Sequence, residues 1–187
     1  IIGGRHVARS YGIPARTTLL RNDSQQGTPH FTDVTEEVAP ALQTLGMVTD
    51  LVWTDLDGDS WQDLMLVGEW MPLTYLKNQQ GHFTDMTAEI GWAETQGWWF
   101  CIEQADLNQD GRPDYVLGNA GTNYKHQASA TEPFELYVDD FDGNGHHDLV
   151  LGYYNQGKQF PVRGRQCSSE QMPSIKAKYA DYHSFAS

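Results

Sequence analysis

The sequence predicts an all-β fold assembled from repeated units, and three observations support this prediction. Short stretches of alternating apolar and polar residues are typical of half-buried strands. Loops rich in aspartate and glycine separate these stretches, as expected for turns between strands. A longer pattern also recurs, because the segment around Phe31 returns 52 residues later around Phe83. A fixed period of this length is typical of repeat architectures.

Composition narrows the range of partners. The chain has 187 residues, with 12 Lys and Arg against 25 Asp and Glu, so its formal net charge is −13. Such acidity argues against nucleic acid or an anionic membrane as the main partner. The hydrophobic fraction of 39% is that of a folded domain rather than a disordered tail. No apolar run approaches the roughly 18 residues of a membrane span, so no direct membrane insertion is predicted.

The predicted strands come in pairs around three loops. Alternation precedes each loop, at Leu51 and Trp53, at Ile102 and Gln104, and at Leu136 and Val138. After each loop a short apolar run ends at glycine, as LMLVG, YVLG and LVLG. The order strand, turn, strand is therefore predicted three times.

The segments between these pairs also repeat. LLRNDSQQGTPHFTDVTEE at residues 19–37 returns as YLKNQQGHFTDMTAE at residues 75–89. NQQGHF and NQGKQF are predicted as further hairpin turns. We predict units at about residues 15–70, 71–120 and 121–165. SIKAKYADYHSFA, with Ser174 as N-cap, predicts one helix, so residues 166–187 form a short helical C-terminal extension.

The three loops carry oxygen-bearing side chains at four fixed positions. They read DLDGDSWQDL, DLNQDGRPDY and DFDGNGHHDL. Positions one, three, five and nine hold Asp55, Asp57, Asp59 and Asp63 in the first loop; Asp106, Asn108, Asp110 and Asp114 in the second; and Asp140, Asp142, Asn144 and Asp148 in the third. Carboxylates this close repel one another unless a cation or hydrogen-bond donors compensate. Position six is glycine in two loops and Ser60 in the other.

Calcium is the cation that this pattern favours. It takes about six to eight oxygen ligands, and side-chain oxygens at alternate positions of a tight loop can surround it. The helical calcium hand requires a glutamate at position twelve, where this chain has Leu66, Leu117 and Leu151, so that motif is excluded. Turn capping by Asp and Asn is the alternative. It accounts for one or two such residues in a loop but not for a fourth at a fixed ninth position.

The loops and the connecting FTDVT and FTDMT segments resemble the FG-GAP or VCBS repeats, over residues 1–165. This resemblance implies a segment of an integrin-α-type β-propeller with about three blades of antiparallel strands. It also implies about three Ca²⁺ ions, held by the side chains given above and by the position-seven carbonyls of Trp61, Arg112 and His146. The third loop with QMPSIKAKYADY resembles more narrowly large bacterial extracellular proteins that often carry an ASPIC/UnbV domain.

Two classes of function are compatible with this resemblance. The first is a calcium-binding propeller segment of an extracellular or cell-surface protein, used for adhesion or for binding a protein or glycan. The second is a propeller enzyme acting on polysaccharide, a lyase or hydrolase with structural calcium. The sequence has no G-x-S-x-G and no phosphate-binding loop, and no catalytic residue is predicted, which favours the first class.

We expect the chain to be a piece of a longer secreted protein whose signal peptide lies outside it, because it starts without methionine. The end blades of such an arc would have exposed apolar faces, so self-association is expected.

Several histidine, tryptophan and cysteine residues are predicted to have structural roles rather than to bind a ligand or form a disulfide. His126, His146 and His147 are predicted as surface residues rather than zinc ligands, because their spacing provides no third partner. GWWF at residues 97–100, together with Trp92, is predicted to belong to a strand core rather than to stack on sugars. Cys101 is predicted as a buried apolar residue rather than a disulfide partner of Cys167.

Overall fold

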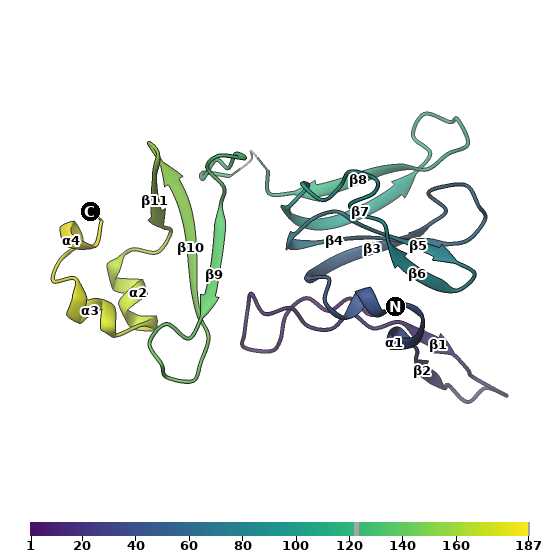
Figure 1. Cartoon of the computed structure of the whole chain (residues 1–187), viewed down its shortest axis with the longest axis horizontal. Coiled ribbons are helices and arrows are strands. Elements are labelled where there is room, and N and C mark those ends of the chain that lie inside the picture. Colours follow the sequence, from purple (N-terminus) through teal and green to yellow (C-terminus); the bar gives the residue numbers. More distant parts are fainter. Residues whose placement is uncertain (122–123, 187) are drawn as a thin grey trace. The chain divides into compact units, whose positions relative to one another are not determined.

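The computed structural model describes residues 1–121 and 124–186 (Figure 1). Strand makes up 39% of the chain and helix 13%, and the strands form three antiparallel sheets, which confirms the predicted all-β class. The chain divides into two compact units, residues 1–7 with 14–120, and residues 8–13 with the chain from 121 onward. None of the described helices is long and apolar enough to cross a membrane.

The centre of the first unit is a four-stranded meander. Strands β3 (Met47–Thr54), β4 (Asp63–Met71), β5 (Thr74–Gln79) and β6 (His82–Asp85) follow one another, each antiparallel to the next. Four antiparallel strands in sequence order are what one propeller blade contains. The number of blades stays a prediction.

Two hairpins and two short helices complete this unit. Strands β7 (Gly97–Ala105) and β8 (Asp114–Asn119) pair with each other, and β7 also pairs with the end of β4. Strands β1 (Leu20–Asn22) and β2 (Phe31–Asp33) form a separate two-stranded sheet. Helix α1 (Thr35–Val38) and the 3₁₀ helix η1 (Pro40–Gln43) follow β2.

Strand β4 is buried on both faces. Leu64 and Leu66 pack into one hydrophobic cluster with residues from the β1–β2 segment and η1. Met65 and Val67 pack into a second cluster with Ile102 of β7. Because both faces are covered, the strand reads as the continuous apolar run LMLVG rather than as an alternating pattern.

The repeated FTDVT and FTDMT segments each close the open end of their own hairpin, β1–β2 and β5–β6, in the same way. The buried Thr35 hydroxyl accepts from the Leu19 N–H at 2.8 Å and donates to Asp33 at 2.6 Å. The Thr35 hydroxyl and N–H lower the pKa of Asp33 below its usual 3.8. In the second copy the Thr87 hydroxyl accepts from the Tyr75 N–H at 3.1 Å. The threonine of this motif therefore satisfies a backbone donor of the strand beside it.

We expect Thr35→Val to lower the free energy of unfolding by about 1–3 kcal/mol, because it leaves the buried Leu19 N–H without an acceptor while preserving side-chain shape. Urea unfolding measures the change. Thr28→Val, at an exposed turn residue, is the control and is expected to have little effect. Equal stability of the two variants would contradict the role given to Thr35.

Three hairpin turns share a Gln-Gly pair. Gln80 and Gly81 between β5 and β6 have φ of 55° and 93°. Gln26–Gly27 and Gln156–Gly157 have the same positive signs, as type I′ turns require. The predicted turns in NQQGHF and NQGKQF are confirmed.

The second unit combines a three-stranded sheet with short helices. Strands β9 (Glu135–Asp139), β10 (Asp148–Asn155) and β11 (Lys158–Pro161) lie in the order β11–β10–β9. Helices α2 (Arg165–Gln171), α3 (Ser174–Lys178) and α4 (Tyr182–Phe185) follow.

The prediction of one helix in SIKAKYADYHSFA is wrong. Helix α3 ends at Lys178, and α4 begins after Asp181, whose carboxylate accepts from the Ser184 N–H at 2.8 Å. Aspartate side chains compete for local backbone donors and so favour helix starts over helix interiors. Ser174 makes no capping bond, because Pro173 occupies the N-cap position.

The predicted burial of Cys101 is also wrong, since this residue is exposed. Both cysteines are free, so the preference for a free thiol over a disulfide to Cys167 agrees with the structure. A register shift in β7 between Trp99 and Cys101 reverses the alternation, so Trp99 and Ile102 face the second cluster. The core prediction for GWWF is correct for Trp99 and wrong for Phe100, which is 46% exposed.

Candidate metal centre

Each aspartate-rich loop connects the first strand of a repeat to the second. The residue before position one pairs across the sheet with position nine, as Thr54 with Asp63, Ala105 with Asp114, and Asp139 with Asp148. All three loops therefore leave and re-enter their sheets in the same register.

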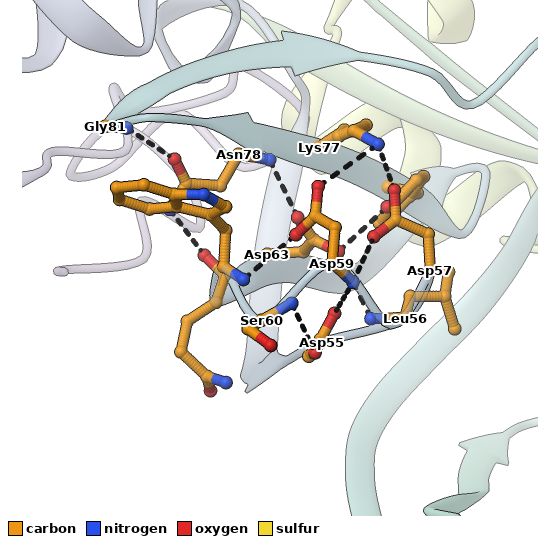
Figure 2. Close-up of polar contacts among 12 residues, drawn as sticks. Asp55, Leu56, Asp57, Asp59, Ser60, Asp63, Lys77, Asn78 and Gly81 are labelled. Carbon is orange, nitrogen blue, oxygen red and sulfur yellow. Dashed lines mark hydrogen bonds and ion pairs between the residues drawn. The ribbon is translucent and has the colours of Figure 1, made fainter.

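Backbone donors hold the side chains of the first loop (Figure 2). The Asp55 carboxylate accepts from the N–H groups of Asp59 and Ser60, at 3.0 and 2.9 Å. Asp57 accepts from the Asp59 N–H at 3.2 Å, and Asp59 accepts from the Trp61 N–H at 2.9 Å. These four bonds orient the oxygens of positions one, three and five.

The same four bonds recur at the same positions in the other two loops, at 2.8–3.2 Å. In the third loop the bonds from Gly145 and Asn144 lower the pKa of Asp140. Asp and Asn do cap backbone donors here, as the turn-capping alternative requires. Each carboxylate oxygen has two lone pairs, so capping by one donor still leaves room for a cation.

Carboxylates converge in two of the loops. Ligand oxygens of Asp55, Asp57 and Asp59 lie within 4.8 Å of one another, and so do those of Asp140, Asp142 and Asp148. In the second loop, position three is an asparagine, which removes one charge. Within the residues that the structure describes, that loop has no group of three carboxylates this close. Clustered negative charge of this kind favours a bound cation.

A cation from the chain itself lies against the first loop. The ammonium of Lys77, on β5, donates to Asp57 and lies 3.3 Å from Asp59 Oδ2 (Figure 2). This hydrogen bond lowers the pKa of Asp57 and raises the pKa of Lys77. The ammonium supplies positive charge to the carboxylates at positions three and five. The donor set therefore fits a hard positive ion that prefers oxygen ligands.

Position nine of the first loop has a different environment. Asp63 is fully buried, and its Oδ1 accepts from the Asn78 N–H at 2.7 Å. Its Oδ2 accepts from the Tyr75 hydroxyl at 2.8 Å and from the Leu56 N–H at 3.2 Å. Burial and this carboxylate raise the pKa of Tyr75. Asp63 thus joins the loop to β5, and it lies outside the group of three carboxylates.

The other two ninth positions share part of this arrangement. Asp114 accepts from the Leu107 N–H at 2.9 Å, and Asp148 accepts from the Phe141 N–H at 3.1 Å. Asp148 also accepts from the Gln171 side chain of α2 at 3.3 Å. A bond from position two to position nine is therefore common to all three loops.

Sequence reasoning missed Lys77, Tyr75, Asn78 and Gln171. Lys77 directly follows Leu76, the strand partner of Leu64, so a predicted register for β4 and β5 could have placed it beside the loop. Nothing local in the sequence indicates Gln171. At position seven, the N–H groups of Trp61, Arg112 and His146 bind position five, and the ligand role of their carbonyls stays a prediction.

Ser60 has a backbone conformation that favours glycine. Its φ is 70°, while Gly111 and Gly145 at the same position have φ of 83° and 85°. We expect Ser60→Gly to raise the free energy of unfolding by about 0.5–1 kcal/mol, because the left-handed conformation costs a residue with a Cβ about 1–2 kcal/mol, which greater chain freedom partly offsets.

Ser60→Ala is the matched control, since it removes the hydroxyl but keeps the Cβ, and we expect no gain from it. Chemical unfolding compares the two variants. A higher free energy of unfolding in both variants would assign the effect to the hydroxyl. A lower free energy of unfolding in Ser60→Gly would contradict backbone strain at Ser60.

The three histidines that were considered as zinc ligands differ in exposure. His146 and His147 are exposed, as predicted. His126 is only half-exposed, and its ring lies 4.3 Å from that of Tyr153 and stacks on Phe134, so the surface prediction is wrong for this residue.

Comparison with known families agrees with the loop geometry. Residues 55–117 match the family model of the FG-GAP-like repeat, which confirms the predicted resemblance for this segment. The matched segment contains the first and second loops. FG-GAP repeats are typical of extracellular proteins. No curated protein matches the chain. The narrower resemblance to proteins with an ASPIC/UnbV domain stays a prediction.

Proposed function

We propose that this chain is a calcium-binding segment of a β-propeller in an extracellular protein, and that the propeller serves adhesion or binds a protein or glycan ligand. The observation that carries the proposal is the set of four hydrogen bonds repeated in three loops, which orients side-chain oxygens at the same positions each time. The FG-GAP-like match supports the extracellular setting.

The residues that would hold calcium are those at positions one, three and five of each loop, with position nine of the third. They are Asp55, Asp57 and Asp59; Asp106, Asn108 and Asp110; and Asp140, Asp142, Asn144 and Asp148. Carboxylate and amide oxygens are the ligands that calcium prefers. The Lys77 ammonium against the first loop supports the fit, because it shows positive charge accepted there.

We assign the ion a structural role. Each loop connects two paired strands, so a bound ion would neutralise the clustered charge and hold the connection rigid. Binding to the folded state alone stabilises it by mass action. We expect the modest affinity of extracellular calcium modules, with dissociation constants on the order of 0.1–1 mM.

Calorimetric titration with calcium tests this proposal on wild type and on Asp110→Ala. Asp110 accepts from the Arg112 N–H and supplies an oxygen to the second loop, so its loss should remove about one bound ion. Glu94→Ala, at an exposed residue outside the loops, removes the same charge as Asp110→Ala and should bind the same number of calcium ions as wild type. Absence of calcium binding to wild type at 10 mM would overturn the proposal.

A further inference from the structure

We propose that Lys77 is a built-in competitor for calcium at the first loop, so that this loop fills at a higher calcium concentration than it would without the ammonium. The inference rests on the proposed function of the loops as calcium sites. It concerns how the chain regulates one of them.

The geometry places Lys77 on the oxygens that the ion needs. Its ammonium donates to Asp57 and lies 3.3 Å from Asp59, and Figure 2 shows it bridging these two carboxylates. They are positions three and five of the loop, two of the three side chains that converge there. A calcium ion on these oxygens would lie close to the ammonium, and because two cations repel each other at such distances, the ion binds well only if the ammonium leaves.

Partial burial makes this competition effective. The side chains of Lys77, Asp57 and Asp59 are 24%, 32% and 35% exposed. Charges in such partly desolvated positions interact more strongly than fully hydrated ones. A ligand that binds only the fraction of molecules with a free site has its apparent affinity reduced by that fraction. The ion pair therefore raises the calcium concentration at which the first loop fills.

The other two loops lack such a competitor. Among the described residues, no lysine or arginine forms an ion pair with a carboxylate of the second or third loop. The side chain next to Asp148 is the neutral Gln171. These loops differ from the first in this respect while sharing its hydrogen bonds. The third loop, whose three carboxylates also converge, is thus expected to fill before the first.

Terbium(III), a luminescent substitute for calcium, is the probe for the first loop. Trp61 lies within this loop at position seven, where the other loops have Arg112 and His146. Terbium emission on tryptophan excitation therefore reports mainly the first loop, and Trp61→Phe should remove most of the signal. We expect Lys77→Met to move the emission midpoint to roughly threefold lower terbium, the scale of a solvent-screened ion pair. Methionine keeps the length of the side chain and removes its charge.

Two further variants complete the test. Lys158→Met removes the same charge from an exposed residue of β11 and should leave the midpoint unchanged. Lys77→Arg keeps a cation that can donate to both carboxylates, so its midpoint should equal or exceed that of wild type. Circular dichroism at high calcium checks folding, and Lys77→Gln replaces Lys77→Met if the latter unfolds.

The outcomes separate this inference from the proposed function. A midpoint that is equal in wild type and in the folded Lys77→Met or Lys77→Gln protein overturns the role of Lys77, even if calorimetry shows calcium binding. An equal shift in Lys158→Met also overturns it, because overall charge then accounts for the effect. Absence of any calcium or terbium binding overturns the proposed function itself.

Discussion

Replacing Asp63 with alanine is expected to lower the free energy of unfolding by about 3–5 kcal/mol, because three donors then lose their acceptor and each buried unsatisfied group costs about 1–3 kcal/mol. These donors are the N–H groups of Leu56 and Asn78 and the hydroxyl of Tyr75. The residue is fully buried, so water does not readily replace the carboxylate. Urea unfolding in chelator measures the effect.

Asp63→Ala is expected to lose the same free energy of unfolding in buffer with calcium, because the role of Asp63 is to anchor the loop to β5. Tyr75→Phe removes one of the donors and should cost about 1 kcal/mol. A large loss in calcium combined with no loss in chelator would show that Asp63 acts mainly as a metal ligand. That result would contradict the anchoring role.

Calcium at 10 mM is expected to raise the free energy of unfolding by about 1.4–2.7 kcal/mol for each filled loop, given dissociation constants on the order of 0.1–1 mM. For a chain of this size, each kcal/mol raises the melting temperature by about 2–4 °C. Differential scanning calorimetry in chelator and in calcium measures the shift. Magnesium at the same concentration is the control and should shift it less, because it keeps its waters. Identical melting temperatures in chelator and calcium would contradict the structural role of the ions.

The positions of the three aspartate-rich turns were predictable from the sequence because their geometry is local. Backbone N–H groups two to five residues away hold the side chains at positions one, three and five. The Gln-Gly turns were predictable for the same reason, since positive φ at Gly81 and Gly157 is a property of the turn itself.

Features that depend on distant contacts were not predictable from local pattern. A bulge beside Cys101 reverses which side chains of β7 face the core, and its position is set by pairing with β8. Burial of β4 on both faces depends on hairpins from either end of the unit. Lys77 reaches the first loop because of the register between β4 and β5.

The break between α3 and α4 had a local signal that apolar spacing obscured. Ile175, Tyr179, Tyr182 and Phe185 are spaced as on one helix, but Asp181 caps the second helix and ends the pattern. The bond from the Ser184 N–H to the Asp181 side chain starts a new helix, and this local effect outweighed the apolar spacing that predicted a continuous one.

A crystal structure determined in 10 mM calcium, with an anomalous difference map, would locate the bound ions. We expect one peak in each loop, about 2.3–2.6 Å from the oxygens of positions one, three and five. In the first loop, the Lys77 ammonium should have left Asp57 and Asp59 wherever the peak is strong. Loops without peaks, held by the same backbone hydrogen bonds that Figure 2 shows for the first loop, would mean that the aspartates only cap turns and do not bind calcium.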